Sequence, residues 1–181
     1  MQTNAPTIHA TLRLIARLFE RRLQPSVPFV MDSLFDRLAH ATDGEDAISI
    51  EDRIWLLWMK HPNRAAEAVL NQATNDIAAR RFDIAETRLA RLLRVCPQYA
   101  EAWHKLATLH YLLGRDEESI GEYHRSLELE PRHFGALCAV GEILIGRGEA
   151  EGAALAFGSA LRIHPHHHAA RERLNSLRAA K

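Results

Sequence analysis

Four prolines recur at a nearly constant interval along this chain. Pro62, Pro97, Pro131 and Pro165 are 35, 34 and 34 residues apart. A proline ends a helix because its ring clashes with the preceding turn and its nitrogen carries no hydrogen-bond donor. An interval this regular therefore predicts one helical unit that is copied along the chain.

Aligned on their closing prolines, three copies span about 66–99, 100–133 and 134–167. Each copy has two apolar-periodic runs separated by a turn at Arg80, Gly114 or Gly148, which predicts a helical hairpin. One hairpin cannot bury both of its faces, so we expect neighbouring hairpins to stack. Short side chains at the eighth and twentieth places would allow two helices to approach closely, and these residues are Ala73, Ala107, Gly141, Ala85, Ser119 and Ala153.

The second and third copies also carry residues of a recurring repeat skeleton. They are Trp103, Leu106, Ala107, Gly114, Tyr123 and Pro131 in the second copy, and Gly141, Gly148, Ala153, Phe157, Ala160 and Pro165 in the third. With this spacing the chain resembles the tetratricopeptide repeat (TPR) family, which has a W-L-G-Y-A-F-A-P skeleton. The segments "RIWLLW" and "EPRHFGAL" are similar to small bacterial TPR proteins without a settled activity.

The first copy departs from the TPR pattern. Gln72 and Asp76 stand at usually apolar places, and Arg80 replaces the turn glycine. These departures predict an irregular or loosely packed first helix.

The resemblance implies an all-α TPR solenoid of stacked antiparallel hairpins. Residues 65–181 hold the three hairpins and a capping helix around 169–177, whereas 29–64 form a degenerate hairpin and 1–28 an amphipathic helix. A capping helix with a polar outer face is typical of the end of a repeat array.

The amino-terminal helix admits three interpretations. Ile8, Leu12, Ile15, Phe19 and Leu23 share one helical stripe, with arginines beside it. The helix caps the repeat core, docks on a membrane surface through residues 8–23, or serves as a targeting peptide. Arginines interrupt the apolar run that a secretory signal needs, and no run reaches the roughly 18 residues of a membrane span. We therefore expect a cytoplasmic protein, with a periplasmic or membrane-associated one as the alternative.

Composition and motifs argue against catalysis and nucleic-acid binding. Lysine plus arginine and aspartate plus glutamate both number 23, so no net positive field attracts nucleic acid. The chain has no Gly-rich phosphate loop, GxSxG elbow or HExxH helix, and Cys96 and Cys138 lack CxxC spacing. His104 is expected to line the groove, and His110 and His124 are expected at surface or half-buried places, rather than as acid and base groups. We expect no enzyme and no cofactor.

The segment "HPHHH" raises the question of a metal site. His164, His166, His167 and His168 offer imidazole ligands. Adjacent residues at a helix start point in different directions, however, and no acidic or sulfur ligand is near in sequence. A solvated turn is the simpler interpretation, and no specific metal site is expected.

The TPR resemblance implies where a partner binds. The first helix of each hairpin lines a concave groove, with side chains at its second, fifth, ninth and twelfth places. Those places hold Glu67, Leu70, Thr74, Ile77, Glu101, His104, Thr108, Tyr111, Gly135, Cys138, Glu142 and Ile145. This mixed lining favours an extended or helical peptide of another protein, with Tyr111 as an aromatic anchor.

Three other uses of the groove remain as alternatives. The amino-terminal helix fills it against Leu70, Ile77 and Ile145, the protein self-associates, or the repeats recruit a partner to a membrane. The carboxylate clamp by which some relatives bind chaperone tails is reduced to Lys105, beside Glu101 and Glu142. A single cation, without a second one beside it, holds a terminal carboxylate poorly, so chaperone-tail binding is disfavoured.

Overall fold

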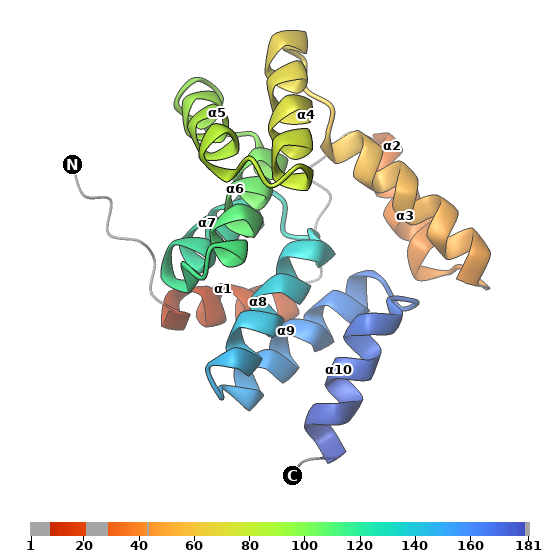
Figure 1. The fold of residues 1–181 in the computed structure, drawn as a ribbon. Coiled ribbons are helices and arrows are strands. Elements are labelled where there is room, and N and C mark those ends of the chain that lie inside the picture. Colours follow the sequence, from red (N-terminus) through yellow and green to blue (C-terminus); the bar gives the residue numbers. More distant parts are fainter. Residues whose placement is uncertain (1–7, 21–28, 43, 180–181) are drawn as a thin grey trace. The chain divides into compact units, whose positions relative to one another are not determined.

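The structure is a computed structural model that describes residues 8–20, 29–42 and 44–179 (Figure 1). These residues form α-helices and contain no strand. The helices are α1 (Ile8–Glu20), α2 (Phe29–Ala39), α3 (Gly44–Trp58), α4 (Arg64–Ala78), α5 (Phe82–Val95), α6 (Ala100–Leu112), α7 (Asp116–Leu129), α8 (Phe134–Gly146), α9 (Ala150–Ile163) and α10 (His168–Ala179). The prediction of an all-α fold built of helical hairpins is confirmed.

The chain divides into two compact units. The first contains the described residues of Met1–Thr11 and Trp58–Glu130, and the second those of Leu12–Leu57 and Pro131–Lys181. The segment that we interpreted as a degenerate hairpin, α2 and α3, thus belongs to the unit of the third hairpin.

The first unit is a stack of two hairpins. Helix α4 packs on α5, α6 packs on α7, and α5 packs on α6 (Figure 1). Its core is continuous across both hairpins, because Leu70, Leu89 and Leu109 are all fully buried in one cluster. Ala73 and Ala85, at the eighth and twentieth places, are also fully buried, as close helix approach requires.

Helix α4 is regular, so the prediction of an irregular first helix is wrong. Asn63 caps it, accepting a hydrogen bond from the backbone N–H of Ala65 at 2.9 Å. Asp76 stands at a usually apolar place, and the helix accommodates it because Arg81 and Arg88 each lie 2.7 Å from its carboxylate. These ion pairs also hold the pKa of Asp76 below its usual value, chiefly through the Arg81 hydrogen bond.

The three hairpin turns share a left-handed residue. The φ angles are 58° at Arg80, 71° at Gly114 and 75° at Gly148. A side chain in this region costs about 1–2 kcal/mol because its Cβ crowds the following carbonyl oxygen. The first hairpin therefore stores backbone strain that the others avoid.

We expect Arg80→Gly to raise the free energy of unfolding of the first unit by about 0.5–1 kcal/mol, measured by urea titration. Arg80→Ala is the matched control. It removes the guanidinium that lies 5.8 Å from the Phe82 ring centroid but keeps Cβ, so it should not stabilise. Equal stabilisation by both variants would show that strain at Arg80 is not the cause.

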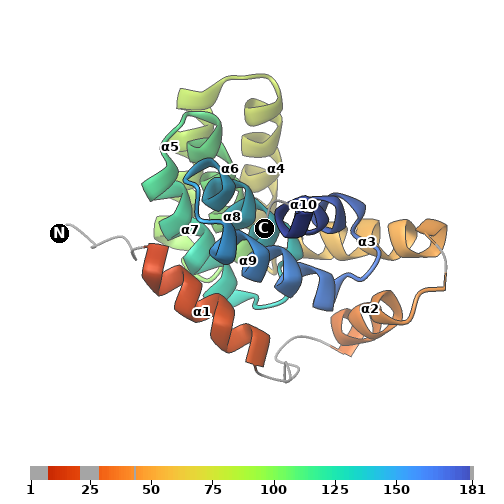
Figure 2. The same cartoon turned by 90° about the horizontal axis from the view of Figure 1, so that it is seen from below.

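In the second unit α8 packs on α9, and α9 also contacts α10 and α2 (Figure 2). Phe134, Leu137 and Val140 of α8 are fully buried. Gly141 lies against Phe157 of α9, where an added Cβ would be 2.7 Å from the ring. The small residue at the eighth place thus brings the two helices together, as predicted.

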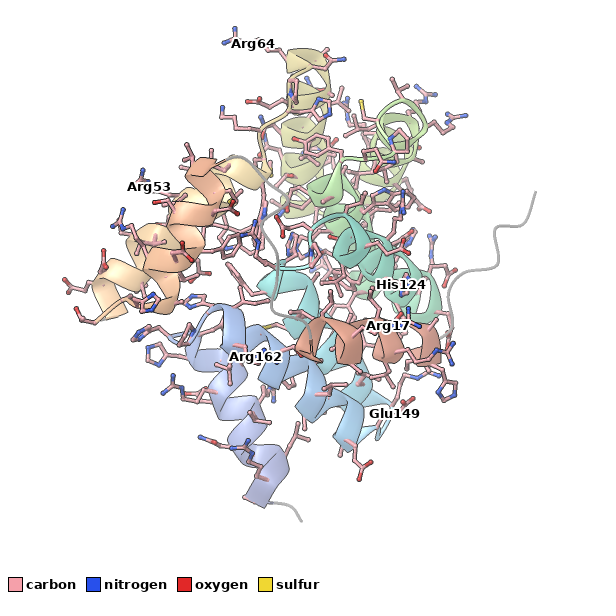
Figure 3. The ribbon with its side chains drawn as sticks, turned by 180° about the vertical axis from the view of Figure 1, so that it is seen from behind. Arg17, Arg53, Arg64, His124, Glu149 and Arg162 are labelled. Atoms are coloured by element: carbon pink, nitrogen blue, oxygen red, sulfur yellow. The ribbon has the colours of Figure 1, made fainter. Side chains whose placement is uncertain are left out.

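Helix α1 buries part of its predicted apolar stripe. Ile8 is 7% exposed and Ile15 is 0% exposed. In the first unit Thr11 Oγ1 lies 3.2 Å from Nδ1 of His124 on α7, a residue labelled in Figure 3. In the second unit Leu12 contacts Gly152 on α9. Leu23 and the side chain of Phe19 lie outside the described residues.

Both of these contacts of α1 are with second helices of hairpins, α7 and α9, whereas the groove-filling alternative needs contacts with first helices. Among the helices that the structure describes, none is both long and apolar enough to cross a membrane.

Candidate functional site

The first helices of the first unit, α4 and α6, carry eight of the predicted groove residues. Three of them are internal. Leu70 is fully buried in the core, His104 is 8% exposed, and Glu101 is 1% exposed. Lys105, the single cation at the predicted clamp places, lies 2.8 Å from the Glu101 carboxylate. These residues hold the hairpins together and present little surface to a partner.

Other predicted residues are engaged in local bonds. The hydroxyl of Thr74 donates to the Leu70 carbonyl at 3.0 Å, and that of Thr108 donates to the His104 carbonyl at 2.9 Å. Glu67 pairs with Lys60 at 2.9 Å, and this bond holds the pKa of Glu67 below its usual value. Thr74, Thr108 and Glu67 still keep part of their surface exposed.

Tyr111 is the large predicted groove residue that the structure leaves open to solvent. It is 40% exposed, and it is followed by Leu112 at 54% and Leu113 at 36%. The corresponding residue of α4, Ile77, is half-buried against the core of the unit. Tyr111 and Leu112 are the last two residues of α6, and Leu113 is its C-cap. These three exposed apolar residues at the end of the helix are called here the α6 apolar patch.

Sequence reasoning found Tyr111 and missed the two leucines. The signal was the run "YLL" directly before the turn glycine Gly114. The sequence analysis gave these leucines no role, because helical periodicity alone does not show where the end of a helix extends beyond its core.

A partly buried polar network, with the buried His110 at its centre, links the two hairpins of the first unit. His110 Nδ1 lies 2.8 Å from Glu122, and its Nε2 lies 3.2 Å from Glu86 of α5. Arg115 donates to Glu86 at 2.8 Å. The hydrogen bond to Glu122 raises the pKa of His110, whereas burial raises the pKa of Glu122. The hydrogen bond from Arg115 lowers the pKa of Glu86.

This network makes the stability of the first unit depend on pH. Because the folded pKa of His110 is raised, its stabilisation is complete below the unfolded value of about 6.5 and is lost as the pH rises through the folded value. The raised pKa of Glu122 acts in the same direction.

We expect the stability difference between the parent and His110→Gln to shrink from about pH 6 to about pH 9, measured by urea titration. The exposed His9, changed to Gln, is the control and should leave the pH profile unaltered. A difference that is constant across this range would contradict the protonation argument.

In the second unit the first helix of the third hairpin, α8, is covered by other segments. A Cβ on Gly135 would lie 2.7 Å from the Trp55 ring of α3. Cys138 Sγ lies 3.8 Å from His167 Nε2, and Glu142 pairs with Arg173 of α10 at 2.8 Å. Ile145 is half-buried. The predicted groove residues of this hairpin are therefore largely occupied by intramolecular contacts.

Cys138 is poorly suited to act as a nucleophile. Burial raises the pKa of its thiol to about 12, so the reactive thiolate is scarce at neutral pH.

The "HPHHH" segment connects α9 to α10, and its histidines have different partners. His164 is 2% exposed, and its Nε2 lies 2.9 Å from the carboxylate of Glu51 on α3. His166 lies 2.8 Å from the Ala41 carbonyl, and His167 Nδ1 accepts the backbone N–H of Ala170 at 3.2 Å. The interpretation as a solvated turn is thus wrong for His164.

These contacts attach the α2–α3 segment to the third hairpin. The hydrogen bond from His164 lowers the pKa of Glu51, which keeps the carboxylate ionised. Arg132 pairs with Asp32 of α2 at 2.8 Å and lies 4.2 Å from the Phe35 ring centroid.

The fold and this site define a helical-repeat protein made of 34-residue hairpins. The tetratricopeptide repeat family profile matches residues 70–129. A TPR repeat-containing protein of Rhizobium etli is 31% identical over 147 residues, which cover 81% of this chain and 72% of the relative. The chain belongs to the tetratricopeptide repeat family.

Solved structures support the same fold. The first TPR of Spaghetti, bound to the HSP90 peptide SRMEEVD, has a TM-score of 0.60 at 14% identity and covers 64% of this chain and 91% of that one. A crystal structure of MamA protein has a TM-score of 0.59 at 16% identity, covering 82% of this chain and 79% of MamA. TPR folds are in general protein–protein interaction modules and are typically non-enzymatic.

Proposed function

We propose that this protein is a non-enzymatic scaffold that binds an extended or helical peptide of a partner protein on α4 and α6. The observation that carries the proposal is the α6 apolar patch, three large apolar residues that the hairpin core leaves exposed. Tyrosine is enriched among residues that dominate binding energy, since it combines a large apolar ring with a polar hydroxyl. Tyr111 is the proposed anchor.

The residues beside the anchor support peptide recognition. Ile77 adds apolar surface at the corresponding place of α4, and Glu67, Thr74 and Thr108 supply polar groups with exposed surface. A peptide that places an apolar side chain on Tyr111 and pairs its backbone or polar groups with these residues fits this lining. The positions on α8 are left out of the proposed site because α3, His167 and α10 contact them.

The expected ligand differs from the one in the Spaghetti complex. A peptide such as SRMEEVD ends in a carboxylate that needs free cations. Lys105 is already paired with the buried Glu101. We therefore propose recognition through apolar side chains, with the carboxy terminus of the peptide left unbound.

The test is site-specific photocrosslinking. A benzoyl-phenylalanine residue replaces Tyr111, or replaces Ile84 as the matched control, since Ile84 is 46% exposed on α5. The proposal expects a crosslinked partner from Tyr111 and none from Ile84. Crosslinking to the same protein from both positions would contradict it.

The identified peptide is then titrated against the parent and Tyr111→Ala/Leu112→Ser. Loss of an anchor side chain should raise Kd by about 30-fold or more. The fully buried Leu70 is unsuitable as a surface probe, because Leu→Ala in a core costs about 2–5 kcal/mol of stability. The SRMEEVD peptide should show no saturable binding below roughly 100 μM, and tight binding of it would overturn the apolar-anchor proposal.

A further inference from the structure

The outer side of the first hairpin contains an apolar hollow. It lies between the first half of α4 and the second half of α5 and has a volume of about 340 Å³. Ala65, Val69, Leu92 and Val95 line it, with Arg88 and Arg91 at the rim. Val95 is 77% exposed, the largest value for a large apolar side chain among the described residues.

The repeat pattern explains why this hollow is open. Val69 occupies the same place in the first hairpin as Trp103 in the second. Trp103 packs against the core of the unit, and its Nε1 donates to the Pro97 carbonyl of the first hairpin at 2.9 Å. In the first unit the two-hairpin stack covers the second hairpin on this side. The corresponding apolar side of the first hairpin is not covered in this way, because no hairpin of the first unit precedes it.

The charge at the hollow is positive. Arg88 is engaged with Asp76 and Gln72, but Arg91 and Arg94 extend from the exposed side of α5. On the same helix, Glu86 is already bound by Arg115 and His110. The hollow therefore suits a helix that carries apolar and acidic side chains on one face.

Helix α3 of this chain presents such a face. Glu45, Ile48, Asp52 and Leu56 recur at three- and four-residue steps and are exposed, so they share one outward stripe. Ile48 is 58% exposed and Leu56 is 64% exposed. They are eight residues apart, which is about 12 Å along a helix. Arg53, labelled in Figure 3, extends from α3 at the flank of this stripe.

We propose that the outward stripe of α3 docks into the α4–α5 hollow of a second copy of this chain. Ile48 and Leu56 then pack on Val69, Leu92 and Val95. The carboxylates of Glu45 and Asp52 face Arg91 and Arg94, which have no ion-pair partner within the part of the chain that the structure describes. The occupant is a second copy because the same chain supplies both the apolar match and the opposite charge. This self-association uses a surface different from the α6 apolar patch, so it does not depend on the proposed peptide binding.

A single helix in a hollow of this size makes a small interface, below the roughly 1,200 Å² of a stable complex. Association is therefore expected to depend on concentration in the micromolar range and to weaken with salt, because exposed ion pairs are screened.

Sedimentation velocity of the full chain tests this proposal. The weight-average mass should rise above the monomer value between about 5 and 500 μM. Leu56→Asp should weaken association at least about 10-fold, because it places a charge in the apolar floor. Ile84→Asp, on a different exposed part of α5, is the matched control and should leave association unchanged.

A charge swap makes the test specific for the pairing. Asp52→Arg and Arg91→Asp should each weaken association, and the chain carrying both should recover most of it. The four substituted residues, Asp52, Leu56, Ile84 and Arg91, are all exposed, so circular dichroism should show unchanged helicity. A monomeric mass at every concentration overturns the proposal. An Ile84→Asp effect equal to that of Leu56→Asp, or a double variant no better than the single ones, also overturns it.

Discussion

Phe134→Ala should lower the free energy of unfolding of the second unit by about 3–5 kcal/mol. Phe134 is fully buried, and its ring meets three others. The centroid of the Phe134 ring lies 5.7 Å from that of Trp55, 5.1 Å from that of His164 and 6.1 Å from that of His167. These partners come from α3 and from the α9–α10 turn, so one deletion removes packing from several segments.

Urea titration measures the loss in the free energy of unfolding, and amide hydrogen exchange shows which helices lose protection. Because Trp55 packs on Phe134, we expect amides of α3 to lose protection together with those of α8. Phe134→Leu, which keeps most of the volume, should cost less than about half as much. A loss confined to α8 would show that α3 is attached mainly by the Glu51–His164 and Arg132–Asp32 pairs.

The hairpins could be predicted from the sequence because their signals are local. Proline spacing, apolar periodicity and the turn residues each act within one copy, and a residue's place in the copy determines its neighbours. Arg80 illustrates this, since its place in the copy predicted a turn there, as at Gly114 and Gly148, and all three residues adopt a positive φ in the structure. The same reasoning placed Gly141 at a position where two helices of a hairpin approach closely, and in the structure it lies against Phe157 of α9.

Long-range polar pairs could not be predicted in this way. Asp76 suggested a disturbed helix because its partner Arg88 lies 12 residues away, and helical periodicity carries no information about such a pair. His164 suggested a solvated turn because Glu51 is 113 residues away in sequence. In both cases a buried polar residue has a partly exposed partner, which satisfies the hydrogen bonds that burial would otherwise remove.

The residues predicted to line the groove differ in their exposure to solvent. Leu70, Glu101 and His104 occupy groove places yet are buried, whereas Leu112 was not predicted and is exposed. Position in a repeat gives the direction of a side chain, but exposure also depends on which other segments reach it. For Gly135 and Glu142 those segments are α3 and α10.

Gly141→Ala should destabilise the second unit by about 1–3 kcal/mol, even though alanine is the better helix former. The added Cβ would lie 2.7, 2.8 and 2.9 Å from three atoms of the Phe157 ring. Phe157 is 1% exposed, so its ring has no free space into which it can move. Strain from overpacking then exceeds the gain of up to about 1 kcal/mol from replacing a helical glycine.

Gly146→Ala in the same helix is the matched control, because nothing lies within 4 Å of its added Cβ. It should be neutral or stabilise by up to about 1 kcal/mol, so two identical substitutions in α8 should have opposite signs in urea titrations. Phe157→Leu removes the ring atoms that clash, and the double variant Gly141→Ala/Phe157→Leu should therefore be more stable than the sum of the single effects by about 1 kcal/mol. Strict additivity would mean that the cost at Gly141 arises elsewhere than at the α8–α9 contact.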